Sequence, residues 1–172
     1  MDDDRLHPYL DEVRRTNSGL LFGRWRAVEY SDAMQWFMSR NRFDEYELFR
    51  LLFSSDVFRE ALPALAVPQK LDRVAAGLEQ QWAGALTLDG AWAGLIMQGG
   101  AYERFCGTAR EAKNLAAQAV NALIGDRFED FRVDLSHDAW TPWFKNVAWD
   151  HTYVLTDTRN AEITVFCITD TD

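Results

Sequence analysis

The chain has 172 residues, of which 48% are hydrophobic and 26% are charged, and its formal net charge at pH 7 is −9. This length and composition are typical of one globular domain, and we predict a single domain over residues 1–172. The negative charge argues against nucleic acid and anionic membranes as partners, because both are polyanions that bind cationic surfaces.

The negative charge is unevenly distributed. Residues 126–172 contain 10 acidic and 4 basic residues, a net charge of −6, whereas residues 1–125 contain 17 acidic and 14 basic residues, a net charge of −3. We therefore expect an acidic surface on the C-terminal third. Such a surface suits a basic protein partner or a cation, or it serves only to keep the protein in solution.

Cellular location is predicted from the cysteines and from the opening residues. Cys106 and Cys167 lack the short spacing of a metal or redox motif. The opening sequence MDDDR does not resemble a signal peptide, and no apolar run approaches the length of about 20 residues that spans a bilayer. We expect a cytoplasmic protein with reduced thiols.

The first half of the chain has mainly helical patterns. Apolar residues at positions 6, 9, 10 and 13 predict a helix that ends at Asn17-Ser18-Gly19. Residues 20–30 are ambiguous, and a strand is one interpretation. Further helices are expected after the capping residue Ser31, over Asp44–Phe53, after the capping residue Ser55, and over Pro68–Trp82.

Residues 85–98 allow two interpretations. Asp89-Gly90 fits a two-residue hairpin turn, but Asp89 also fits the start of a helix. We favour a strand over Leu95–Gln98, because Gly99-Gly100 ends the apolar run abruptly.

The following segment has clearer signals. Thr108 and Glu111 form a capping-box pattern that opens a helix, and Gly125 is suited to end it. Phe128, Phe131 and Val133 then indicate a strand.

Residues 142–172 contain two alternating apolar runs around a polar turn, which predicts a β-hairpin. If the turn is centred on Thr158-Arg159, Thr156 faces Ala161 and His151 faces Phe166. Helices first and strands last predict an α+β fold, in which the helical N-terminal half covers one face of a small antiparallel sheet built mainly from the C-terminal third. A doubly wound sheet would need regular βαβ alternation.

Asp170, Asp172 and His151 are candidate metal ligands, because carboxylates and imidazoles bind divalent metals. Asp170 and Asp172 would share one face of a strand, whereas Asp150 would point away from His151. The expected register places Asp170 about 13 Å beyond the point opposite His151. These residues therefore have two interpretations. They form a metal-dependent, hydrolase-like site, or they belong to a core hairpin with a solvated acidic tail.

Two further groups are candidates for ligand or partner binding. Gly99, Gly100 and Tyr102 form a glycine turn in which backbone amides are able to approach an anion, although the lysine of a phosphate-binding loop is lacking. Trp140 and Trp143 lie beside a proline and suit a stacking platform, or else the core. These residues support a small-molecule binding domain as an alternative function. No cofactor is predicted, and His137-Asp138 lacks the sequence context of a nucleophile.

The segments GGAYERF, PWFKNVAWDHT and TDTD resemble a group of uncharacterised bacterial proteins of similar length. The resemblance covers roughly the second half of the chain. It implies a compact bacterial domain, and it implies no particular activity. The preference for Arg (15 residues) over Lys (3 residues) suits a GC-rich genome.

The first interpretation of function is a non-catalytic protein-interaction module, such as an immunity-type inhibitor or an adaptor. It follows from the acidic C-terminal third, the many aromatic residues and the lack of an assembled catalytic motif. An unpaired edge strand of the terminal hairpin would also allow a homodimer, because a second copy could cover it.

Overall fold

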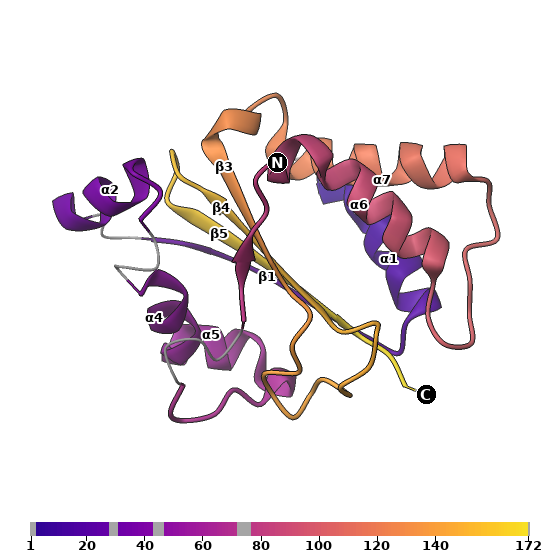
Figure 1. Ribbon diagram of the computed structural model, residues 1–172, viewed down its shortest axis with the longest axis horizontal. Helices are drawn as coiled ribbons and strands as arrows, with labels where there is room; N and C mark the ends of the chain where they lie inside the picture. The colour runs from indigo at the N-terminus through magenta and orange to yellow at the C-terminus, as the bar shows by residue number, and fades with distance from the viewer. Residues whose placement is uncertain (1–2, 28–30, 43–46, 72–76, 172) are drawn as a thin grey trace.

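The protein is an antiparallel sheet with helices on both faces (Figure 1). The computed structural model describes residues 3–27, 31–42, 47–71 and 77–171. The predicted α+β class is confirmed, because most helices come from the N-terminal part of the chain and β3, β4 and β5 come from the C-terminal third.

The elements follow one another without repeats along the described residues. The helices are α1 (His7–Thr16), α2 (Asp32–Ser39), α4 (Leu48–Ser54), α5 (Asp56–Ala61), α6 (Gly84–Gln98) and α7 (Ala109–Ile124). Short 3₁₀ segments cover Asp3–Arg5, Pro63–Leu65 and Phe128–Asp130. The strands are β1 (Gly19–Arg26), β2 (Glu79–Gln80), β3 (Phe131–Ser136), β4 (His151–Asp157) and β5 (Glu162–Thr169).

The strand order is β1-β5-β4-β3-β2, and all neighbouring strands are antiparallel. The terminal hairpin β4–β5 therefore lies inside the sheet, with β1 on one side and β3 on the other. The expectation of an unpaired hairpin strand is wrong, because both hairpin strands have two strand neighbours.

Local sequence signals explain where several helices begin. The hydroxyls of Ser31 and Ser55 accept hydrogen bonds from the backbone N–H groups of Met34 and Phe58, as predicted for N-caps. Thr108 and Glu111 form both hydrogen bonds of the capping box. These bonds satisfy N–H groups that the first helical turn leaves without a partner.

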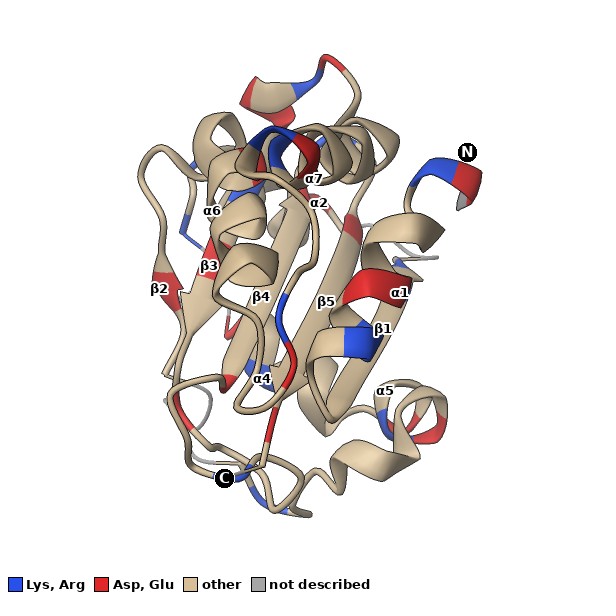
Figure 2. Cartoon of the chain, turned by 90° about the vertical axis from the view of Figure 1, so that its right-hand side faces the viewer, with Lys and Arg blue, Asp and Glu red and all other residues tan. Residues whose placement is uncertain are grey.

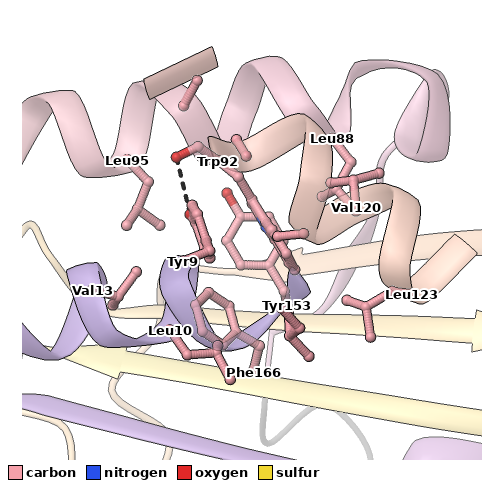
Figure 3. Close-up of a cluster of buried hydrophobic side chains, with 14 of the residues drawn as sticks. Tyr9, Leu10, Val13, Leu88, Trp92, Leu95, Val120, Leu123, Tyr153 and Phe166 are labelled. Carbon is pink, nitrogen blue, oxygen red and sulfur yellow. Dashed lines mark hydrogen bonds between the residues drawn. The ribbon is translucent and has the colours of Figure 1, made fainter. Parts of the chain in front are cut away.

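One face of the sheet packs against α1, α6 and α7 around the fully buried indole of Trp92 (Figure 3). The ring of Tyr9 stacks on Trp92 with 5.0 Å between ring centroids, and the Tyr9 hydroxyl donates a hydrogen bond to the Trp92 carbonyl. Phe166 and Tyr153 contribute from β5 and β4, at 5.1 and 6.1 Å from Trp92. Trp92 thus joins α6 to α1 and to the sheet.

The other face packs against α2, α4, α5 and the loop before β4. Phe53 stacks on Trp140 at 4.9 Å, and Val154, Val165 and Cys167 are buried beneath them. The prediction that helices cover only one face is wrong. Both alternating sets of hairpin side chains are apolar, and each set requires its own cover.

The strand expected over Leu95–Gln98 is also wrong, because these residues are the last turn of α6. This helix is apolar on nearly every side, so it lacks the polar stripe that reveals an amphipathic helix.

The helix predicted over Pro68–Trp82 is not found in the described residues, because residues 68–71 are not helical. Residues 72–76 lie outside the described residues. Glu79 and Gln80 pair with Leu135 and Asp134 of β3, and Trp82 lies in the turn before α6. Tertiary pairing has overridden the helical pattern there.

The hairpin register differs by two residues from the prediction. Asp157 pairs with Glu162, and His151 pairs with Ile168 instead of Phe166. The Asp157 carboxylate accepts backbone hydrogen bonds from Arg159 and Asn160, which fixes the turn at residues 158–161. A shift of two residues leaves every side chain on its predicted face.

Candidate functional site

Asp170 ties three segments of the chain together. Its buried carboxylate accepts hydrogen bonds from the backbone N–H groups of Ser18, Ala101 and Thr171, at 3.0, 2.7 and 2.8 Å. Burial alone would raise the pKa of Asp170, but these donors outweigh it and hold the pKa below its ordinary value. Asp170, which the sequence predicted as a metal ligand, therefore has a structural role in this fold.

His151 lies on the same sheet face as Asp170, but its ring meets His137, and the two Nδ1 atoms are 2.9 Å apart. Asp150 points to the opposite face, as predicted, and accepts hydrogen bonds from the Thr169 hydroxyl and the Val147 N–H. Among the described residues, no group of three or more His, Cys, Asp or Glu side chains is arranged to hold a metal ion. Asp172 lies outside those residues, so the three-residue metal site stays a prediction.

Burial of His151 makes stability depend on pH. Burial, with the charge of His137 adding to it and Asp150 opposing it, lowers the pKa of His151 to about 4. The unfolded chain takes up this proton near the ordinary value of about 6.5. Between these pH values the unfolded state binds more protons than the folded state. The free energy of unfolding therefore has its full value above pH 6.5 and decreases as the pH falls towards 4. We expect a loss of at most about 3 kcal/mol.

Urea unfolding between pH 7.5 and pH 4 measures this loss. The matched variant is His151→Gln, which keeps a polar side chain without a titrating proton. Its stability should depend less steeply on pH over the same window. Parallel curves for the two proteins would show that His151 is not responsible.

The predicted glycine turn is built into the core. A Cβ atom on Gly100 would lie 2.0 Å from the Asp170 carboxylate and 2.2 Å from the Thr16 carbonyl oxygen. Gly99 has φ +66°, a backbone conformation that favours glycine. These contacts give both glycines a packing role, whereas the side chain of Tyr102 is exposed.

The two tryptophans of the predicted stacking platform lie on the other side of the sheet. Trp140 is buried, and its indole N–H donates to the Thr152 hydroxyl. Trp143 is partly exposed and covers Gly19, where a Cβ atom would lie 2.9 Å from its ring. The structure therefore does not unite the glycine turn and the tryptophans in one pocket, and ligand binding by either stays a prediction.

The acidic C-terminal third exposes less charge than its composition suggests. Asp134, Asp150, Asp157 and Asp170 are buried, and Glu162 pairs with Arg24. Asp134 pairs with Arg132 at 2.6 Å, and Asp157 pairs with Arg127 at 2.6 Å. Much of the negative charge thus serves hydrogen bonds and ion pairs inside the fold.

An unexplained surface feature is the outer face of α6, defined here by Leu86, Gly90, Gly94 and Met97 together with Trp82 in the turn before the helix. The side chains of Trp82 and Leu86 are 91% and 72% exposed, and that of Met97 is 39% exposed. Leu86, Gly90, Gly94 and Met97 follow one another at intervals of three or four residues, so they lie along one side of α6. An exposed apolar side on a helix whose opposite side is already buried indicates an interaction surface.

At the two glycines of this face, an added side-chain atom would meet almost nothing in the described part of the chain. A Cβ atom on Gly94 would meet no atom within 4 Å, and one on Gly90 would meet only the Lys113 ammonium at 3.7 Å. Glycine inside a helix costs about 1 kcal/mol relative to alanine. The common reason to accept this cost is the close approach of another backbone.

The outer face of α6 is also uncharged. Asp89 is the one acidic or basic residue of the helix, and it pairs with Lys113 of α7 at 3.0 Å. Figure 2 accordingly shows α6 almost without red or blue. None of the helices in the described part of the chain has the length and hydropathy of a membrane span.

A second apolar surface lies over α4 and α5. A hollow of about 240 Å³ is lined by apolar side chains, which include Trp25, Leu48, Leu52 and Val57. Val57 is 65% exposed. The hollow has no counterpart to the glycine pair, so α6 remains the stronger candidate.

Sequence reasoning missed the α6 face because it favoured a strand at the end of this segment. The signal was present as Gly90-x-x-x-Gly94 in an apolar stretch, a spacing that brings helices close together.

No protein-family model matches the chain, and no curated protein matches it. Two solved structures of citrus MAF1, in space groups P 31 2 1 and C 2 2 21, are similar to it at 11% sequence identity. The aligned parts cover 97% and 96% of this chain and 99% of each MAF1 chain, with TM-scores of 0.46 and 0.45. A likeness this distant transfers no function to this chain.

Proposed function

We propose that this protein is a protein-interaction module, of the adaptor or immunity-inhibitor kind, that binds through the outer face of α6. The observation that supports the proposal is the combination of exposed Trp82 and Leu86 with two glycines, Gly90 and Gly94, at which an added Cβ atom would meet at most the Lys113 ammonium among the described residues. A large exposed aromatic residue is a common anchor of protein interfaces.

The uncharged face changes what kind of partner is expected. The basic partner suggested by the sequence would have to bind exposed acidic residues such as Asp126, Glu129 and Asp138. Binding through α6 would depend on apolar contact instead, and added salt should not weaken it. Binding of a basic protein would weaken steeply as salt screens the charges.

Affinity capture from the native host, at low and high salt, tests the proposal. We expect the wild-type protein to retain a stoichiometric protein at both salt concentrations, and we expect Leu86→Glu to lose it. The matched control is Val57→Glu, which places the same charge on the exposed apolar surface over α5. Loss with Val57→Glu alone would move the binding surface to the α4–α5 hollow. Equal capture by both variants would contradict the proposal.

A further inference from the structure

We infer that the outer face of α6 binds the same face of a second copy of this chain, so that the protein is a two-fold symmetric homodimer. This inference rests on the proposed function and names the partner for that surface. It differs from the edge-strand dimer expected from the sequence, because the terminal hairpin is internal to the sheet.

The pattern along α6 is complementary to itself. Gly90 and Gly94 form the low centre of the face, Leu86 lies four residues before the first glycine, and Met97 lies three residues after the second. A two-fold axis through the glycine pair makes the two helices antiparallel. Leu86 of each copy then faces Met97 of the other, while the glycines let the backbones approach closely.

Charge does not oppose a second copy at this face. Each chain carries a net charge of −9, so two copies repel one another wherever uncompensated acids meet. The outer face of α6 avoids this repulsion, because Asp89, the one acidic residue within the helix, is already paired with Lys113. Neither a strongly basic nor a strongly acidic partner gains any charge attraction there. A second copy brings an equally neutral face, and salt should strengthen the dimer by screening the remaining repulsion.

Sedimentation velocity on the purified full chain tests this inference. We expect a species of twice the 19.8 kDa chain mass. Its fraction should rise with protein concentration, over a range of about 1 µM to about 1 mM, and with added NaCl. Dissociation on adding salt would overturn the proposed interface, because it would indicate contact between opposite charges.

Gly94→Leu is the decisive variant, because the isolated chain has room for the new side chain. It should fold with an undiminished melting temperature, yet its dimer dissociation constant should rise about 30-fold or more, as for loss of an interface hot spot. The matched control is Gln118→Leu, which adds leucine to an exposed position of α7 and should leave dimerisation unchanged.

Two outcomes separate this inference from the proposed function. A wild-type chain that stays monomeric over the whole range would overturn the homodimer. If Leu86→Glu still loses a different protein during capture from the host, the interaction function stands. A dimer that persists in Gly94→Leu would show that the copies meet through another surface.

Discussion

Replacing Trp92 with alanine is expected to lower the free energy of unfolding by about 3–5 kcal/mol, the range for truncating a large buried side chain. The indole is fully buried, stacks on Tyr9 and contacts Phe166 and Tyr153 across the sheet. Its loss would leave a cavity where α1, α6 and the sheet meet. The Tyr9 hydroxyl donates to the backbone carbonyl of residue 92, which the substitution retains. This one hydrogen bond would not compensate for the lost packing.

Urea unfolding of dilute protein, followed by circular dichroism, measures this effect. The matched control is Trp82→Ala, which removes the same side chain from a position that is 91% exposed. It should change the stability of the monomer by less than about 0.5 kcal/mol. Similar losses for the two variants would show that Trp92 is not the centre of this core.

The second large effect is expected for Asp170→Ala. This variant leaves the N–H groups of Ser18, Ala101 and Thr171 without their carboxylate acceptor. Hydrogen bonds to a charged group contribute more than neutral ones, but Ser18 and Thr171 are exposed and water can replace part of the loss. We expect a cost of about 3 kcal/mol in the free energy of unfolding.

The same experiment separates the structural role of Asp170 from the predicted metal role. Asp138→Ala is the control, because Asp138 is an exposed acidic residue and should cost less than about 0.5 kcal/mol. A structural role requires the Asp170→Ala loss to appear in the presence of a chelator. If Asp170→Ala lowers stability only when Zn²⁺ or Mn²⁺ is present, the carboxylate is a metal ligand instead.

Local signals predicted much of this fold because they do not depend on distant partners. The caps at Ser31, Ser55 and Thr108 lie where the sequence placed them, since each acts on N–H groups within three residues. The faces of the terminal hairpin were also predicted, because side chains alternate along any strand. The two-residue register error arose from the Asp157 side chain, whose turn contacts have no simple periodic pattern.

The parts that depend on tertiary contacts were not predictable in the same way. Helix α6 combines a core side and an apolar outer side, so its pattern resembles a buried strand as much as a helix. The sequence predicted the acids near the chain end and the Gly99-Gly100 turn as separate binding groups, but it could not reveal that Asp170 and Gly100 contact one another. The outer face of α6 became visible only when the helix was placed against the sheet.

The central position of β5 has a consequence for folding during synthesis. β5 lies between β1 and β4, and β1 pairs with it along all eight residues from Gly19 to Arg26. On the ribosome, β1 emerges long before residues 162–169 exist, so it must wait without its neighbour while the intervening helices form. Contacts between such distant parts of a chain slow folding. The last of these five strands to be synthesised therefore joins the two parts of the sheet, and a nascent chain that stops before Glu162 cannot complete the sheet.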